Sequence, residues 1–164
     1  MGKITFTTGE VYSFDAPVSV YEAARALELT SRETVAAMVS GAVTELSHVV
    51  TEDREVKLLT YRDPEGARVF RHTAAHIMAQ AVKRLYPETK QTIGPATDTG
   101  FFQDFDSEVS FTPEVLAKIE AEMKKIVKEN LLIERFELPR NEAIALMKEA
   151  DEPYKVERIE ELPS

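Results

Sequence analysis

A single long helical segment that carries two histidines places the strongest constraint on the fold of this chain. Between residues 68 and 86 apolar side chains recur at the helical period, at Ala74, Ile77, Met78, Ala81 and Leu85. At about 100° per residue, this stripe lies opposite the face that carries His72 and His76, which are one helical turn apart. Pro87 follows, as is typical of a helix end. The segment therefore predicts a helix with one face in a core and two neighbouring imidazoles on the other, where Ala75 and Ala79 leave room for an approaching group.

The residues before this helix have the pattern of short strands around one short helix. Residues 3–14 are predicted to form a β-hairpin, and further strands are predicted at 35–39 and 55–60. Between them, Ser19 and Glu22 have the spacing of a capping box at a helix start. This order predicts a small α+β module.

A polar connection with Pro and Gly, residues 62–67, is the predicted domain boundary, which divides the chain into 1–62 and 63–164. After the histidine helix, Gly94, Pro95 and Gly100 mark turns. The sequence then predicts, in order, a strand over 101–105, a helix from Thr112 to Asn130, a strand over 131–138, a short helix capped by Asn141 and a final strand over 154–159. The predicted fold class is α+β throughout.

The composition excludes several classes of protein. Hydrophobic residues make up 43% of the chain and charged residues 30%, which is typical of a globular protein. No apolar run approaches the roughly 18 residues of a membrane span, the N-terminus lacks a secretory signal, and there is no cysteine for a disulfide. We therefore expect a cytoplasmic protein with no membrane partner. Because the formal net charge is −9, any RNA contact is expected to be local.

Three motifs occur in a specific order along the second part of the chain. They are the run from Arg71 to Pro87, the segment with Gly94-Pro and Gly100-Phe-Phe, and the later Glu152-Pro-Tyr-Lys-Val. Together they resemble the N-terminal region of bacterial threonyl-tRNA synthetases, and the resemblance covers essentially the whole chain. It implies that residues 1–62 form a TGS domain of the β-grasp fold. Residues 63–164 would form the N-terminal part of a threonyl/alanyl-tRNA synthetase-type editing domain.

The resemblance also implies a function and a site. The parent enzyme attaches threonine to its tRNA using ATP, and its editing domain hydrolyses mischarged seryl-tRNA. Such a second site is needed because a missing methyl group provides only about 1–3 kcal/mol of discrimination. The implied catalytic residues are His72 and His76, which orient the water and the terminal adenosine, and Lys155, which binds the substrate or stabilises charge. The implied substrate-binding residues are Gly94, Pro95 and Gly100. The chain departs from the family at Gln103, where a tyrosine is common.

Several further expectations follow from the resemblance. The editing site of the family also uses a Cys-x-Gly-Pro-His segment, which is expected to fall after Ser164. No cofactor is expected in this fragment, since ATP, Mg and Zn belong to the absent catalytic core. The partners of the parent are tRNA, L-threonine and ATP, and the parent is expected to be a homodimer. The fragment alone is expected to show no aminoacylation and little or no deacylation.

Three alternative interpretations remain open. A non-catalytic module could use the TGS part to bind RNA or a regulatory ligand, with the second domain as a scaffold. A nucleoside-kinase-like protein could carry a TGS module ahead of its kinase domain. A metallohydrolase could use the histidine pair as zinc ligands, since an i, i+4 spacing suits zinc. However, no glutamate follows the first histidine, and His48 lies in the other module, so no metal is expected within this chain.

Overall fold

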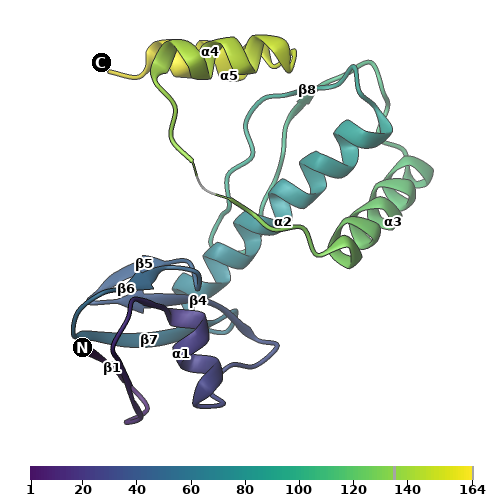
Figure 1. Ribbon diagram of the computed structural model, residues 1–164. Helices are drawn as coiled ribbons and strands as arrows, with labels where there is room; N and C mark the ends of the chain where they lie inside the picture. Colours follow the sequence, from purple (N-terminus) through teal and green to yellow (C-terminus); the bar gives the residue numbers. More distant parts are fainter. Residues whose placement is uncertain (135, 164) are drawn as a thin grey trace. The chain divides into compact units, whose positions relative to one another are not determined.

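A computed structural model describes residues 1–134 and 136–163 of the chain. The residue contacts divide it into two compact units, residues 1–71 and 72–164 (Figure 1). The division falls inside helix α2 (Pro64–Leu85), later than the polar connection in the sequence. The units combine helices with mixed and antiparallel sheets, which agrees with the predicted α+β class. No helix in the described part of the chain has the length and apolarity needed to cross a membrane.

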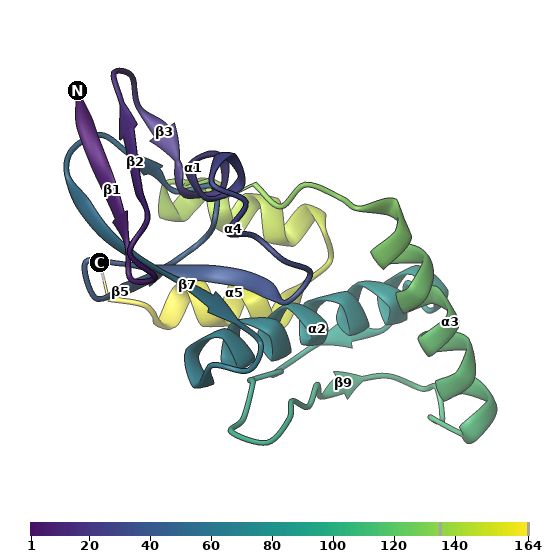
Figure 2. The same ribbon diagram turned by 90° about the horizontal axis from the view of Figure 1, so that it is seen from below.

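The first unit is built on a mixed sheet with strand order β2-β1-β7-β4-β5 (Figure 2). Its strands are β1 (Gly2–Phe6), β2 (Val11–Phe14), β4 (Thr34–Val39), β5 (Ala42–Thr44) and β7 (Arg54–Thr60). The two central strands β1 and β7 run parallel, and the other neighbours pair antiparallel. A second small sheet joins β3 (Val18–Ser19) to β6 (Val49–Val50). The predicted hairpin and both later strands are confirmed.

Helix α1 (Val20–Ala26) supplies the other side of the first core. Ser19 and Glu22 form the predicted capping box, in which the Glu22 amide donates to Ser19 Oγ at 3.1 Å and the Ser19 amide donates to Glu22 at 3.0 Å. These bonds satisfy amides that the first helical turn leaves unpaired. The helix can then bury its apolar face against the sheet, where Ile4 and Val56 are fully buried.

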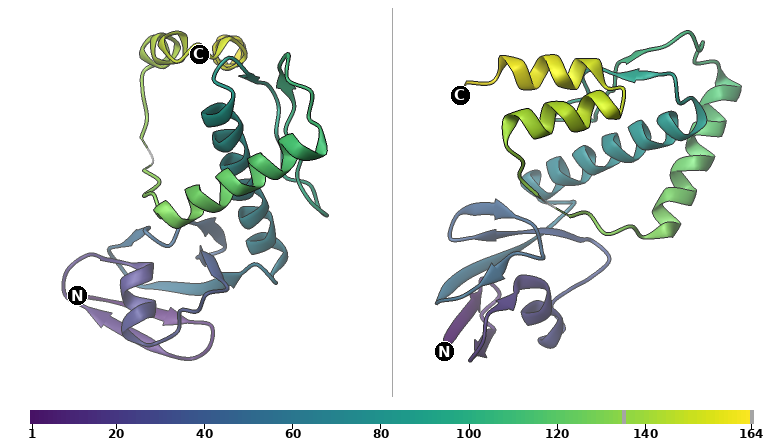
Figure 3. Two further views of the ribbon diagram at one scale, coloured as in Figure 1. Left: turned by 90° about the vertical axis from the view of Figure 1, so that its right-hand side faces the viewer. Right: turned by 45° about the horizontal axis from the view of Figure 1, so that its top comes forward.

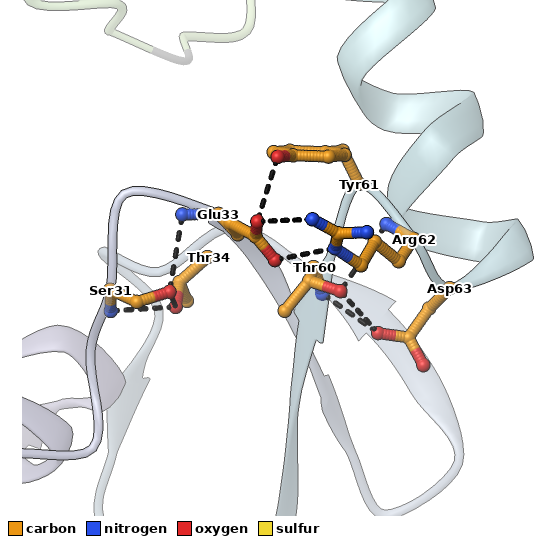
Figure 4. Close-up of polar contacts among 7 residues, drawn as sticks. All are labelled: Ser31, Glu33, Thr34, Thr60, Tyr61, Arg62 and Asp63. Atoms are coloured by element: carbon orange, nitrogen blue, oxygen red, sulfur yellow. Dashed lines mark hydrogen bonds and ion pairs between the residues drawn. The ribbon is translucent and has the colours of Figure 1, made fainter.

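The end of β7 joins α2 through a compact polar cluster (Figure 4). Glu33 accepts two hydrogen bonds of 2.7 Å from the Arg62 guanidinium and one of 2.8 Å from the Tyr61 hydroxyl. These donors lower the pKa of Glu33 to about 2, chiefly through the Arg62 bonds. Asp63 accepts from the Thr60 amide at 2.9 Å, and its carbonyl accepts from the amide of the first helical turn.

The predicted connection at 62–67 is therefore too long, because α2 begins at Pro64. Proline is favourable at the first helical position, where its missing amide hydrogen would have no partner. The Asp63 carboxylate meanwhile holds the preceding strand end in a tight turn. Pro64 and Gly66, which are typical of turns, lie inside the helix here.

The second unit packs helix α3 (Pro113–Glu129) against the later turns of α2 (Figures 1 and 2). Its core contains buried residues from both helices, namely Ala81, Val82, Ile119 and Ile126. Thr112 caps α3 as predicted, with Pro113 at its first position. Leu116 and Val127 of α3 are 53% and 62% exposed although both are apolar, so the buried stripe of the helix is narrow.

A hairpin-like segment follows α2, with β8 (Lys90–Gln91) paired antiparallel to β9 (Phe105–Asp106). Of the predicted strand at 101–105, only Phe105 lies in a strand, and Phe101 forms an isolated bridge with Ala96. Residues 131–134 and 136–138, predicted as a strand, have no regular structure, and Leu132 is 81% exposed. A strand needs a neighbouring strand for its backbone hydrogen bonds, and this segment has none among the described residues.

The last two elements are helices that lie side by side (Figure 3). Helix α4 (Arg140–Glu149) is present as predicted, but it begins before the predicted cap: Pro139 occupies the N-cap position, and Asn141 lies inside the helix and provides no cap. The predicted strand at 154–159 is wrong, because Pro153–Glu161 form helix α5. Its half-buried residues Lys155, Val156 and Ile159 have helical rather than alternating spacing. A short apolar run cannot distinguish the two structures by itself.

Candidate functional site

The two histidines of α2 face each other across one helical turn. The Nε2 atoms of His72 and His76 are 2.9 Å apart, and their ring centroids are 4.5 Å apart in an edge arrangement with an angle of 78°. Both residues are exposed. One ring nitrogen must donate this hydrogen bond and the other must accept it. The arrangement therefore suits a pair in which both rings are neutral or only one is protonated. Two imidazolium ions would instead point two N–H groups at each other.

The surroundings of His76 favour its neutral form. Although His76 is exposed, the protein atoms around its ring remove part of its hydration, and this desolvation is the largest cause that lowers the pKa of His76 below its ordinary value of 6.5, followed by the charges of His72 and Lys155. A neutral imidazole near physiological pH can accept a proton from water, as a general base does. The site is therefore chemically suited to activating or orienting a water molecule.

Lys155, the third residue that the resemblance implies as catalytic, lies on helix α5. Its side chain is 44% exposed, and its charge is one of the causes that lower the pKa of His76, after desolvation and the charge of His72. The sequence placed Lys155 on a strand, whereas it lies on the half-buried face of a helix.

The alanines next to the histidines do not leave an open space. Ala75 is 2% exposed and Ala79 is 5% exposed, so the flank of α2 beside the histidines is covered as well as the face in the core. Small side chains allow another segment to approach the helix closely, and the Gln91 side-chain amide donates to the Ala79 carbonyl at 3.3 Å. The expectation that these alanines admit a ligand is therefore wrong for the conformation described.

Two charged residues beside the site were not identified from the sequence as functional. Lys83 on α2 and Glu152 at the start of α5 form an ion pair of 3.2 Å, and the Glu152 side chain is only 6% exposed. A signal for Lys83 was present, because it lies seven residues after His76 on the same helical face. Nothing in the sequence indicated that Glu152 would be its partner.

The predicted substrate-binding residues lie in the loop between β8 and β9, and their contacts are with that loop. A Cβ atom on Gly94 would lie 1.7 Å from the Gln103 side-chain oxygen, so Gln103 packs directly on this glycine. The exposed Pro95 accepts a weak backbone bond from Phe102 at 3.5 Å, and the Gly100 amide donates to Thr97 Oγ1 at 3.0 Å. These contacts shape the loop, and a substrate role for the three residues stays a prediction.

One cavity of the second unit is lined by residues other than the predicted site residues. A cavity of about 660 Å³ is lined by residues 85–90 and 106–109, none of which is a predicted site residue. Among residues 1–134 and 136–163, no three His, Asp or Glu side chains are placed to hold a metal ion together.

The lowered pKa of His76 predicts a pH dependence of stability. Between this lowered pKa and about 6.5 the unfolded chain binds more protons than the folded chain, so stability is present above pH 6.5 and is lost as the pH falls through the window. We expect His76→Gln to remove this loss, so the variant gains stability relative to the parent chain at acid pH. Urea unfolding at several pH values measures the difference, with His48→Gln as the control. Parallel pH curves for the parent and His76→Gln would contradict the prediction.

Comparison with known sequences identifies what the chain is similar to. No protein-family model matches the chain. Three curated relatives each match 99% of it, at 50% identity in Clostridium kluyveri, 53% in Clostridium tetani and 52% in Clostridioides difficile. These relatives are aminoacyl-tRNA synthetases, which are ligases of protein biosynthesis. The similarity is to one particular synthetase, since all three proteins are named threonine–tRNA ligase.

The predicted resemblance to threonyl-tRNA synthetases is therefore confirmed. The chain spans about a quarter of the length of these relatives, since the match covers 26% of each. The identity extends through both units, because nearly every residue of the chain is included. The names of the relatives do not say what the matching quarter of each relative does.

Proposed function

We propose that this chain is the TGS and partial editing segment of a threonine–tRNA ligase, and that its second unit contributes to the hydrolysis of mischarged seryl-tRNA. The observation that carries the proposal is the exposed pair of imidazoles at 2.9 Å, with the Lys155 charge acting on it. The similarity to threonine–tRNA ligases supplies the substrate, because serine is the smaller amino acid that a threonine pocket excludes poorly.

The residues divide the chemistry of ester hydrolysis in a simple way. The neutral imidazole of His76 accepts a proton from the water that attacks the ester carbon, and His72 holds that imidazole in place through the shared hydrogen bond. When the bond from the ester carbon to the terminal ribose oxygen then breaks, that oxygen takes the proton back from His76, so that free serine and the tRNA hydroxyl are released. Lys155 supplies positive charge for the negative charge that develops on the ester oxygen. Gly94, Pro95 and Gly100 shape the loop that receives the aminoacyl end, and the remaining groups of the site come from a part of the synthetase outside this chain.

The whole synthetase would act with further partners. It joins L-threonine to tRNA at the expense of ATP, works as a homodimer in the cytoplasm, and contacts no membrane. ATP, Mg and Zn would bind in its catalytic core. Here the described residues offer no third His, Asp or Glu ligand beside the histidine pair. The TGS unit would support the contact with tRNA.

The test compares two substrates and two proteins. The full-length synthetase that carries this segment is expected to hydrolyse seryl-tRNA much faster than threonyl-tRNA, whereas residues 1–164 alone are expected to show no threonylation and little deacylation. Release of radiolabelled amino acid from each charged tRNA measures the hydrolysis, and incorporation of radiolabelled threonine into tRNA measures threonylation. Threonylation by the isolated chain would refute the proposal, as would equal hydrolysis of the two charged tRNAs by the full-length protein.

A further inference from the structure

The Glu152 side chain occupies an unusual place in the second unit. It lies at the N-cap position of α5, where an acidic side chain commonly accepts a hydrogen bond from the helix, yet it makes no such bond. Instead its carboxylate is 6% exposed and lies between two lysines, with Oε1 3.2 Å from Lys83 Nζ and Oε2 3.8 Å from Lys155 Nζ. Among the described residues, Oε2 has no hydrogen-bond partner.

Such an arrangement costs free energy and therefore calls for an explanation. A buried carboxylate loses its hydration and is tolerated only where nearby cations and donors compensate. A cap on α5 would cost less free energy, because it would leave the carboxylate more hydrated. Instead the carboxylate contacts Lys83 and Lys155, which belong to two different helices.

The spacing along the two helices relates these contacts to the histidines. Lys83 lies seven residues after His76, about two turns along the same face of α2, and Lys155 lies about one turn after Glu152 on α5. The ion pair of Glu152 with Lys83 therefore fixes the position of the start of α5 along the face of α2 that carries the histidines. Two further contacts hold the start of α5, an Asp151–Lys90 ion pair and a 2.9 Å bond from the Tyr154 hydroxyl to Asp106.

We propose that Glu152 is a positioning residue, whose buried carboxylate anchors α5 to Lys83 and thereby holds the Lys155 ammonium toward the face of α2 that carries the histidine pair. Its consequence for catalysis rests on the proposed editing function, but the placement of Lys155 does not. The influence of the Lys155 charge on the pKa of His76 supports this placement.

The sign of the change in the His76 pKa distinguishes positioning from a simple loss of charge. Glu152→Gln removes a negative charge, which by itself can only lower the pKa of His76 or leave it unchanged. If Glu152 holds Lys155 in place, the freed lysine moves into solvent and the pKa of His76 rises instead. Titration of the histidine resonances of the 164-residue chain by NMR measures the pKa.

A double-mutant cycle separates positioning from a general loosening of α5. We expect Lys155→Met and Glu152→Gln each to raise the pKa of His76, and Glu152→Gln to cause no further rise in the Lys155→Met background. A fall or no change with Glu152→Gln alone overturns the proposal, and so does a further rise in the double variant, since that indicates undocking of α5. Should Glu152→Gln fail to fold, Glu152→Asp keeps the charge and must give the same rise.

An activity measurement connects the proposal to the site. In the full-length synthetase that carries this segment, Glu152→Gln is expected to slow seryl-tRNA hydrolysis about 10- to 100-fold through kcat, as expected for a displaced charge. Threonylation should be unchanged. If His76→Ala does not affect hydrolysis, the proposed editing function is wrong. The NMR double-mutant cycle then still tests whether Glu152 positions Lys155. If His76→Ala abolishes hydrolysis and Glu152→Gln has no effect, the positioning role alone is wrong.

Discussion

His76→Ala in the full-length synthetase that carries this segment is expected to lower seryl-tRNA hydrolysis about 10²- to 10⁴-fold, with threonylation unchanged. That range is typical for the removal of a general acid–base group. The reason lies in the 2.9 Å contact of the ring with His72 and in the lowered pKa of His76, which together keep an acceptor nitrogen available near neutral pH. Pre-steady-state deacylation of seryl-tRNA measures the loss.

Two matched variants make this experiment decisive. His48→Ala removes the remaining histidine of the chain, which lies exposed in the first unit, and should leave hydrolysis within about twofold of the parent. Because His72 and His76 share one hydrogen bond, the double alanine variant should be hardly slower than either single variant. Multiplicative losses would show that the two imidazoles act independently, and an active His76→Ala enzyme would remove the basis of the editing proposal.

Gly66→Ala is expected to destabilise the first unit by about 1–3 kcal/mol, the usual cost of overpacking. The sign of the change in the free energy of unfolding is informative, because alanine normally stabilises a helix by about 1 kcal/mol relative to glycine. Here a Cβ atom would lie 2.0 Å from the Thr60 carbonyl oxygen and 3.3 Å from Val35 Cγ2. The first neighbour is backbone, so no rotamer change can relieve the clash.

The clash is strengthened by how firmly the first turn of α2 is attached. Asp63 accepts from the Thr60 amide at 2.9 Å and from the Thr60 hydroxyl at 3.0 Å, so the helix start cannot move away from β7 without losing both bonds (Figure 4). Urea unfolding of Gly66→Ala measures the loss, with the exposed Arg68→Ala on the same helix as control. Stability equal to or above that of the parent would show that the close approach of α2 and β7 is wrong.

Much of the first unit was predictable because its signals are local. The hairpin, the capping box of Ser19 and Glu22, and the strands ending at Val39 and Thr60 all depend on residues within a few positions of one another. The second unit was predicted well only where the same holds, as at the Thr112 cap of α3. Its errors are at segments such as 154–159, where periods 2 and 3.6 fit a short run equally well.

The candidate site also combines a feature that the local sequence determines with contacts that it does not determine. The pairing of His72 with His76 follows from the sequence, because a helix places side chains four residues apart next to each other whatever surrounds it. The presence of Lys155 beside them, the burial of Glu152 and the ion pair to Lys83 were decided only by the tertiary structure. These contacts join residues far apart in the chain, and the Lys83–Glu152 pair exists because the start of α5 lies close to α2, which no local rule of backbone geometry determines.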